Sequence, residues 1–339
     1  MKRHLLFLAA LLIVNLAASA QKKFSVYAVG FYNQENLFDT CHDEGKKDYE
    51  YLPNKGWNGM KYTNKLRNMS KALADMGTDV LPNVGCAFIG LSEVENHKVL
   101  DALVDQAPLK ARNMKYVHIE GPDRRGIDCA LLYNPSLFSV KNVKLLPYVQ
   151  ELAKDSAFFT RGFLTVRGEM AGDDVAVIVC HWPSRFSGPF YRESAARQVK
   201  VVKDSLLNVN QEMKIFVMGD MNDDPVNKSM HVYLQAKPEI SQVGAGDMYN
   251  PWYNVLAKEG KGTLFYSGNW NLFDQIVITP NLLNKDAKKK DYSSLKYWKS
   301  HIFRRDYLIQ QEGQYKGAPL RTTAGGRWLN GYSDHLPVV

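Results

Sequence analysis

Short clusters of acidic and amide residues recur along the chain where hydrophobic runs end. There are five of them: Asn33-Gln34-Glu35, Ser92-Glu93, Gly219-Asp220-Met221-Asn222, Phe273-Asp274-Gln275 and Ser333-Asp334-His335. A histidine, His181, directly follows the apolar run Val175–Cys180. One acid at a strand end is usually a turn residue, but five similar clusters predict a shared site. Carboxylate and amide oxygens are hard ligands, so this site favours Mg²⁺, with Mn²⁺ or Ca²⁺ as alternatives, over zinc.

The clusters lie within motifs that resemble those of the endonuclease/exonuclease/phosphatase superfamily. In chain order the motifs are NQENLF (33–38), LSE (91–93), HWPSR (181–185), GDMN (219–222), DQI (274–276) and SDHLP (333–337). Each motif is short, but the set follows the family's order and spans Phe24 to Val339. The resemblance implies an α/β fold, a four-layer sandwich of two mixed β-sheets packed face to face with helices on the outside. It also implies metal-dependent hydrolysis of phosphate esters.

The resemblance gives four residues a place in the metal site. Glu93 matches the principal metal-binding glutamate, and Asp334 matches the acid beside the metal. Asn33 and Glu35 match the metal-site residues of the first strand. Glu35 stands where many members have aspartate, and a role as a cap of the next segment stays open.

The catalytic roles also follow from the resemblance. Asp220 matches the acid that activates the attacking water, and Asn222 matches the amide that holds a phosphate oxygen. His335, oriented by Asp274, would donate to an oxygen that gains charge in the transition state. A cation at Glu93 would neutralise the anionic phosphodiester.

Four further positions have weaker support. His181 matches a second active-site histidine, which would protonate the leaving oxygen or hold a phosphate, and Asp128 is expected to orient it. The structural alternative is a core histidine satisfied by Asp128. Arg125 and Arg185 are either phosphate-binding residues or partners in surface ion pairs.

Hydrophobic runs predict the elements that must position these residues. Strands are expected over 24–31, 86–91, 116–120, 127–133, 140–148, 158–170, 175–180, 214–218 and 273–279, and a last strand begins at Leu336. Helices are expected over 62–76, 96–105 and 191–209. No linker interrupts this pattern, so we expect one domain over residues 21–339.

The N-terminus has the organisation of a signal peptide. Lys2 and Arg3 precede the apolar run 5–18, and Ala18-Ser19-Ala20 matches a cleavage site. The run is shorter than the ~20 residues of a membrane span, although an uncleaved anchor is the alternative. We therefore expect residues 1–20 to be removed and the protein to be exported, periplasmic or secreted, without stable membrane insertion.

Composition narrows the possible classes of protein. Hydrophobic residues make up 45% and charged residues 23%, which excludes a disordered chain, collagen and a coiled coil. The cysteines, Cys41, Cys86, Cys129 and Cys180, contain no CxxC pair, which argues against structural zinc. Two disulfides are possible in an exported protein, but the apolar runs around three of the cysteines favour buried free thiols.

The leading hypothesis is a nuclease that acts on the phosphodiester bonds of DNA or RNA. The net charge of +8 suits such an anionic substrate, and no protein partner is inferred. A phospholipid or inositol phosphate hydrolase, such as a sphingomyelinase-like enzyme, is the alternative; GDMN is followed here by Asp223-Asp224-Pro225, unlike in the inositol phosphatases. A non-catalytic binding module is a third hypothesis. Trp182 and Trp270 are interpreted as packing or rim aromatics rather than base-stacking platforms.

Overall fold

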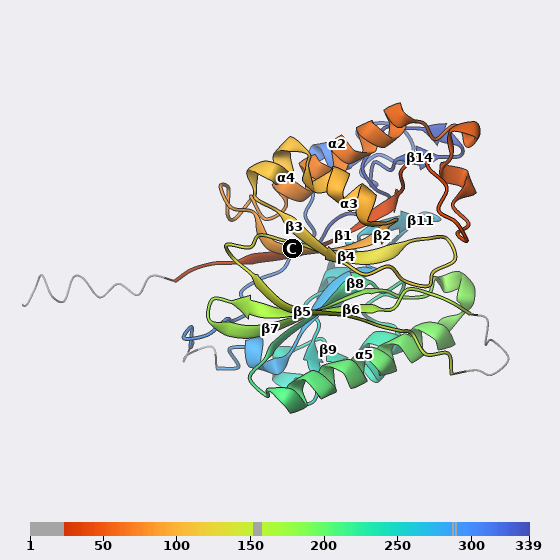
Figure 1. Cartoon of the computed structure of the whole chain (residues 1–339). Helices are drawn as coiled ribbons and strands as arrows, with labels where there is room; N and C mark the ends of the chain where they lie inside the picture. The colour runs from red at the N-terminus through yellow and green to blue at the C-terminus, as the bar shows by residue number, and fades with distance from the viewer. Residues whose placement is uncertain (1–23, 152–157, 287, 289) are drawn as a thin grey trace, which may run out of the picture.

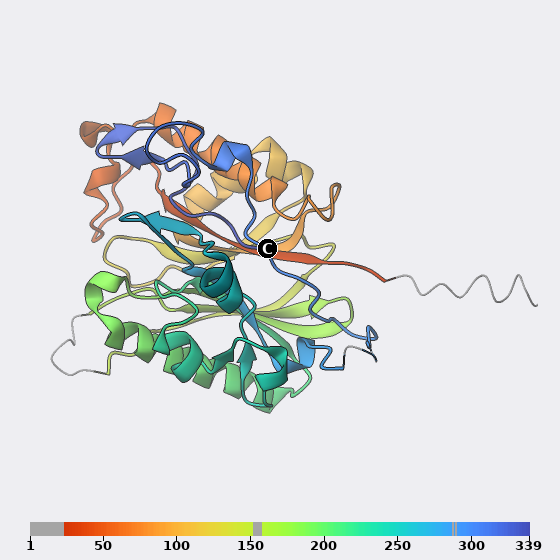
Figure 2. The same cartoon turned by 180° about the vertical axis from the view of Figure 1, so that it is seen from behind.

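Two β-sheets pack face to face in the computed structural model, and helices lie outside them (Figures 1 and 2). The structure describes residues 24–151, 158–286, 288 and 290–339, so the expected signal peptide, residues 1–20, lies outside the described residues. The α/β four-layer sandwich predicted from the sequence is confirmed.

Both sheets mix parallel and antiparallel strands. The first has the order β1 (Ala28–Leu37), β2 (Cys86–Val94), β4 (Asp128–Tyr133) and β3 (Lys115–His118). The second has the order β5 (Ser139–Leu146), β6 (Phe163–Met170), β7 (Asp173–His181), β8 (Lys214–Asp220), β13 (Asp274–Ile278), β10 (Met248–Tyr249) and β9 (Ala236–Lys237). β1 is parallel to β2 and β7 to β8, whereas β13 is antiparallel to β8. Two hairpins stand apart, β11 (Leu264–Tyr266) with β12 (Asn269–Asn271) and β14 (Thr323–Ala324) with β15 (Arg327–Trp328).

Helices cover the outer face of each sheet. α2 (Gly59–Asp75), α3 (His97–Val104) and α4 (Ala107–Ala111) lie beside the four-stranded sheet, and α5 (Pro189–Val209) lies along the seven-stranded one (Figure 1). α6 (Tyr253–Glu259) packs Val255 and Leu256 against the core between the sheets. Asn58 and Asn96 start α2 and α3, because their side chains accept hydrogen bonds from the first free backbone amides.

Three apolar layers hold the sandwich together. The layer between the sheets includes Phe31, Phe88, Val177 and Met218; the layer under α2 includes Leu66, Met69 and Leu91; and the layer under α5 includes Ala196, Val199 and Ile215. Strands buried on both faces explain why β2, β7 and β8 read as unbroken hydrophobic runs.

Three expected strand boundaries were wrong. β6 begins at Phe163 and not at residue 158. β1 starts and ends later than the expected 24–31, because its pairing with β2 begins at Ala28 and continues beyond Phe31. The expected last strand from Leu336 is reduced to single bridges between Val338 and each of Phe31 and Ile302. Pro337 explains the difference, since proline has no amide hydrogen with which to continue a ladder.

The cysteines and helices bear on two further expectations. All four cysteines are unpaired, and Cys86, Cys129 and Cys180 are buried, which confirms the interpretation as free thiols. Across the part of the chain that the structure describes, no helix combines the length and the hydropathy needed to cross a bilayer.

Gly219 lies where β7 and β8 approach each other closely. A Cβ atom there would lie 2.2 Å from the carbonyl oxygen of Cys180. We expect Gly219→Ala to lower the free energy of unfolding by about 1–3 kcal/mol, since neither strand can retreat without losing ladder hydrogen bonds. Thermal melts would measure this as a lower Tm. Gly246→Ala is the control, because no atom lies within 4 Å of the new methyl group; equal melting temperatures for the two variants would contradict the tight approach.

Candidate active site

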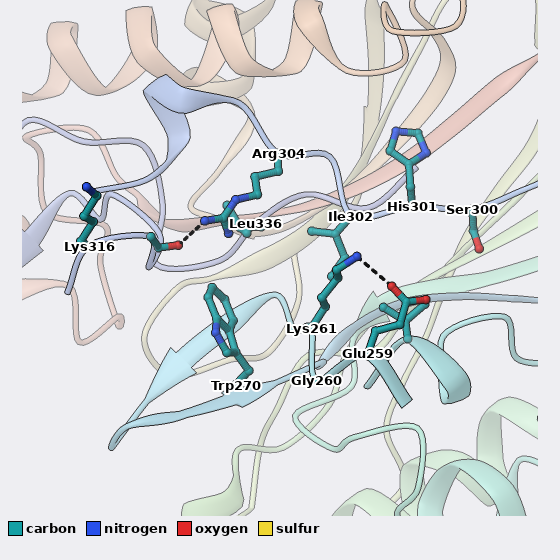
Figure 3. Close-up of a pocket in the computed structure, with 13 residues that line it drawn as sticks. Glu259, Gly260, Lys261, Trp270, Ser300, His301, Ile302, Arg304, Lys316 and Leu336 are labelled. Atoms are coloured by element: carbon teal, nitrogen blue, oxygen red, sulfur yellow. Dashed lines mark hydrogen bonds and ion pairs between the residues drawn. The ribbon is translucent and has the colours of Figure 1, made fainter. Parts of the chain in front are cut away.

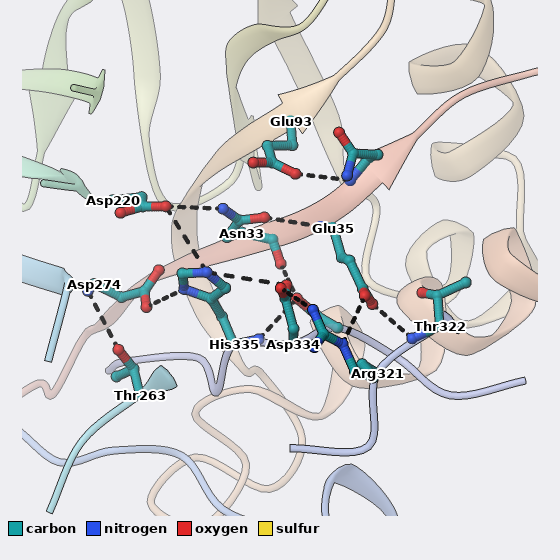
Figure 4. A network of polar contacts seen from close by, with 12 residues as sticks. Asn33, Glu35, Glu93, Asp220, Thr263, Asp274, Arg321, Thr322, Asp334 and His335 are labelled. Atoms are coloured by element: carbon teal, nitrogen blue, oxygen red, sulfur yellow. Dashed lines mark hydrogen bonds and ion pairs between the residues drawn. The ribbon is translucent and has the colours of Figure 1, made fainter. Parts of the chain in front are cut away.

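The predicted metal and catalytic residues come together at one end of the sandwich (Figure 4). β1 and β2 bring Asn33, Glu35 and Glu93; β8 and β13 bring Asp220 and Asp274; the C-terminal segment brings Asp334 and His335. Within the seven-stranded sheet, Asp220 is the register partner of both His181 on β7 and Asp274 on β13. The sheet itself therefore sets these three residues side by side.

Unusual backbone conformations shape the strand ends that carry the site. Glu35, Asn36, Glu93 and Asn222 have φ angles of 46°, 58°, 60° and 49°, a region that residues other than glycine rarely adopt. The ladder between β1 and β2 also shifts register just after Asn33. Such bulges re-aim side chains, and such strain persists where a functional arrangement requires it.

His335 is held by Asp274. The Nδ1 atom of His335 lies 2.6 Å from Oδ2 of Asp274, and both side chains are buried. Burial opposes a positive charge on the imidazole, but the carboxylate of Asp274 prevails and holds the pKa of His335 well above its usual range. His335 is therefore an imidazolium near neutral pH, with Nε2 directed 3.9 Å from the nearest carboxylate oxygens of Asp220 and Asp334.

Asp220 is oriented from both sides. Asn33 donates a hydrogen bond from Nδ2 to Oδ2 of Asp220 at 3.0 Å, and the backbone amide of Asn222 donates to Oδ1 at 2.9 Å. Burial raises the pKa of Asp220, and the charge of His335 works against that rise. A carboxylate that is fixed in this way and has a raised pKa can take a proton from water.

Glu93 and His181 face each other across the site. One oxygen of Glu93 accepts a hydrogen bond from the Asn36 amide at 3.0 Å, while the other lies 3.8 Å from Nε2 of His181. Burial, with help from Arg161 and Arg125, lowers the pKa of His181 well below its usual range, so this imidazole is neutral. A neutral imidazole suits a phosphate-holding role better than that of a proton donor to the leaving oxygen.

Asp128 does not orient His181 in this structure. Its two oxygens accept hydrogen bonds from Nε2 of His118 at 3.0 Å and from the backbone amide of Gly121 at 2.9 Å. The expected partnership was wrong because β3, which carries His118, lies next to β4 in the sheet. Asp128 thus joins two strands beside the site.

Glu35 belongs to a network that the sequence did not reveal. Its oxygens accept hydrogen bonds from the Thr322 amide at 2.6 Å and from Nε of Arg321 at 3.4 Å. Arg321 also donates to Asp334 at 2.7 Å, so its guanidinium bridges two carboxylates (Figure 4). Burial raises the pKa of Glu35, and Asp334 adds to the rise. Both oxygens of Glu35 thus have protein partners, which weakens its predicted role as a metal ligand.

Lys65 lies behind this network, fully buried within α2. Its Nζ donates to Oγ1 of Thr322 and to the Tyr332 carbonyl, each at 2.5 Å. Burial lowers the pKa of Lys65 to about 8, so the ammonium keeps its charge at neutral pH. The sequence held a signal for it, because Lys65 stands four residues before the buried Met69 on the apolar face of the helix.

The two arginines that are predicted to bind phosphate differ in how firmly neighbouring residues hold their side chains. The guanidinium of Arg185 donates to the Asn222 carbonyl at 3.2 Å and to Asp224 at 2.8 Å, and it lies 4.5 Å from the Phe273 ring. It therefore braces the loop after β8. Arg125 is half exposed, and its Nε lies 3.9 Å from a carboxylate oxygen of Asp123, so it can turn towards an incoming phosphate.

Asn222 and Arg161 both donate hydrogen bonds to the carbonyl of Trp182, the residue after His181. Asn222 donates from Nδ2 to the Trp182 carbonyl at 3.0 Å, which leaves the second hydrogen of its amide for a phosphate oxygen. Arg161 is buried and binds both Asp123, at 3.0 Å, and the same carbonyl, at 2.9 Å. The sequence offered no motif for Arg161.

The donor set fits a hard divalent cation. Oε1 of Glu93 and Oδ2 of Asp220 lie 3.8 and 3.7 Å from Nε2 of His181, and Oδ1 of Asp334 lies 3.9 Å from Nε2 of His335. Carboxylate oxygens are the kind of ligand that Mg²⁺ accepts. Ligand atoms of Asp220, Asp274 and His335 also lie within 4.8 Å of one another. In that trio, however, the closeness is explained by the hydrogen bond between His335 and Asp274, so Glu93 and Asp334 remain the predicted cation ligands.

Comparison with solved structures identifies the same fold elsewhere. A mannosyl-6-phosphatase from Bacteroides thetaiotaomicron is 13% identical, with a TM-score of 0.54 and coverage of 92% of this chain and 98% of that one. TDP2 from D. rerio, humanized by 14 mutations, is 12% identical, with a TM-score of 0.52 and coverage of 92% and 96%. TDP2 from C. elegans is 12% identical, with a TM-score of 0.54 and coverage of 96% and 78%. No curated protein matches the sequence.

The sequence itself matches a known family over residues 28–339, which is nearly everything after the expected signal peptide. That range contains every strand of both sheets and all the side chains gathered at their ends. The chain therefore belongs to the endonuclease/exonuclease/phosphatase family.

Proposed function

We propose that this chain is an exported nuclease that hydrolyses phosphodiester bonds of DNA or RNA with the help of Mg²⁺, or of Mn²⁺ or Ca²⁺ in its place. The observation that carries the proposal is the buried pair of His335 and Asp274, which faces the oriented carboxylate of Asp220. The hydrolysis of a phosphate ester by water requires a proton donor and a base, and this geometry supports those two roles for His335 and Asp220.

The residues have distinct tasks in this mechanism. Asp220, fixed by Asn33, takes the proton of the attacking water. His335 donates from Nε2 to a phosphate oxygen that gains charge, and Asn222 holds another such oxygen. A cation held by Glu93 and Asp334 would neutralise the phosphodiester and stabilise the transition state.

The choice of a nucleic acid rests on charge and on the neighbouring side chains. Arg125 and Arg161 add positive charge beside His181, and the whole chain carries +8. The fold also occurs in a mannosyl-6-phosphatase, so a sugar phosphate belongs among the substrates to be tested, together with phospholipids and inositol phosphates. A non-catalytic binding module would not need the fixed Asp220 or the charged His335.

Export is proposed from the N-terminal sequence. The basic residues Lys2 and Arg3, the apolar run 5–18 and the Ala18-Ser19-Ala20 site support cleavage before Gln21 and a periplasmic or secreted protein.

A substrate panel tests the proposed activity. Plasmid DNA, RNA, bis-p-nitrophenyl phosphate, sphingomyelin and mannose 6-phosphate would be compared with Mg²⁺ and with EDTA. We expect the nucleic acids to be turned over fastest, EDTA to abolish turnover and Mg²⁺ or Mn²⁺ to restore it, because the donors are hard oxygens. Full activity in EDTA would exclude the metal mechanism, and faster turnover of sphingomyelin or mannose 6-phosphate would reassign the substrate.

Variants of Glu93 and Asp220 should separate cation binding from water activation. Glu93→Gln should weaken the cation's affinity, so that raised Mg²⁺ partly restores kcat. Asp220→Asn should lower kcat by about 10² or more at any Mg²⁺ concentration, because the base is lost. Asp174→Asn, at the opposite end of β7, is the control and should keep wild-type kcat. The same Mg²⁺ response in the Glu93 and Asp220 variants would refute this division of tasks.

The pair of His335 and Asp274 predicts a pH effect. Because His335 must be protonated, kcat should fall as the pH rises through its elevated pKa, and Asp274→Asn should move that fall to lower pH. His335→Ala and Asp274→Asn should each reduce kcat by orders of magnitude, with the double variant little worse than the worse single one. Fully multiplicative losses, or an unmoved pH limb, would show that the two residues act independently.

A further inference from the structure

A cavity of about 530 Å³ lies beside the β11–β12 hairpin, and Trp270 of β12 is among the residues that line it (Figure 3). Leu264 of the hairpin bridges to His335, and the next residue, Leu336, lines the cavity. Successive side chains of extended backbone point in opposite directions, so the cavity and the active site share one segment of chain. Its volume is within the range of about 300–1,000 Å³ that small-molecule sites occupy.

The cavity is rich in positive charge. Lys261, Arg304 and Lys316 line it, against the single acid Glu259. Glu259 pairs with Lys261 at 2.8 Å, and Arg304 is fixed by a hydrogen bond to the Gly317 carbonyl at 2.8 Å. Lys316 has no carboxylate partner among the residues that the structure describes. The excess of cations predicts an anionic ligand.

An aromatic side chain adds a second kind of contact. Figure 3 shows Trp270 on the hairpin below Arg304, between Lys316 and Lys261. Its indole lies 5.2 Å from the Phe265 ring and 6.0 Å from the Arg304 guanidinium, which fixes its orientation. Trp182, the other tryptophan considered as a stacking platform, is buried and cannot serve as one. Trp270 is the one of the two that lines a cavity.

We propose that this cavity binds a nucleotide of the substrate strand that flanks the scissile phosphodiester. Its base would stack on Trp270, and its phosphate would lie among Lys316, Lys261 and Arg304. Aromatic stacking combined with nearby cations is the chemistry by which proteins hold single-stranded nucleic acid. The assignment rests on the proposed nuclease function, and it extends the substrate contact from one phosphate to a neighbouring nucleotide.

Binding of dTMP, measured by isothermal titration in EDTA, tests the cavity without catalysis. We expect the double variant Lys261→Ala/Lys316→Ala to weaken dTMP binding by roughly fivefold or more. Lys141→Ala/Lys144→Ala removes the same charge from the exposed side of β5 and should bind dTMP like the wild type. An equal loss in both double variants would overturn the assignment, because it would show only a general charge effect.

The contribution of Trp270 is measured separately. Trp270→Leu, after a thermal melt that confirms folding, should weaken the binding of dTMP but not that of inorganic phosphate. Inorganic phosphate that binds the wild type as tightly as dTMP does would overturn the nucleotide assignment. If Trp270→Leu does not fold, the binding of dTMP to the double lysine variants still tests the assignment.

A kinetic measurement distinguishes this inference from the proposed function. On a short single-stranded oligonucleotide, Lys261→Ala/Lys316→Ala should raise KM by more than it lowers kcat. If the protein hydrolyses nucleic acid and the double lysine variant has the same KM as the wild type, the cavity assignment alone is overturned. Failure to hydrolyse DNA and RNA under any metal condition overturns the proposed function, whatever dTMP binding shows.

Discussion

The structure is organised around a concentration of negative charge that the fold must neutralise. Five carboxylates meet at one end of the sandwich: Glu35, Glu93, Asp220, Asp274 and Asp334. Buried charges of like sign cannot all stay ionised unless positive charges lie close by. His335, Arg321 and Lys65 supply three, from the C-terminal segment, a surface loop and a helix. A bound divalent cation, as proposed above, would add to this neutralisation.

The need to hold this concentrated negative charge in place also explains why the two sheets are joined at the site. Asn33 belongs to the four-stranded sheet and Asp220 to the seven-stranded one, and their side chains form a direct hydrogen bond. The apolar layer beneath them, which includes Phe31 and Met218, fixes the separation of the sheets. A close-packed core resists small displacements, so the base and the metal-site residues keep their mutual positions.

What could be predicted from the sequence depended on whether a signal was local. An acid that follows a strand end is a signal in the local sequence. Glu93 and Asp220 were therefore predicted correctly as residues that come together at one end of the sandwich. The partner of Asp128 was not, because the order of β3 and β4 in the sheet decides it. Arg321 was missed for a similar reason, since nothing near it in the sequence shows that its loop folds against Glu35. Pairings across the sandwich are set by topology and not by neighbouring residues.

The C-terminal segment pairs with β1 through backbone hydrogen bonds. Phe31 and Val338 exchange backbone hydrogen bonds of 3.0 Å in both directions, and the hydroxyl of Ser333 donates to the Asn33 carbonyl, 300 positions earlier in the chain. Contacts between such distant residues form late, because the loop they close is long. A growing polypeptide on the ribosome thus presents Asn33 long before it presents His335. Asn33 and His335 can therefore come together only once the C-terminal segment has docked against β1.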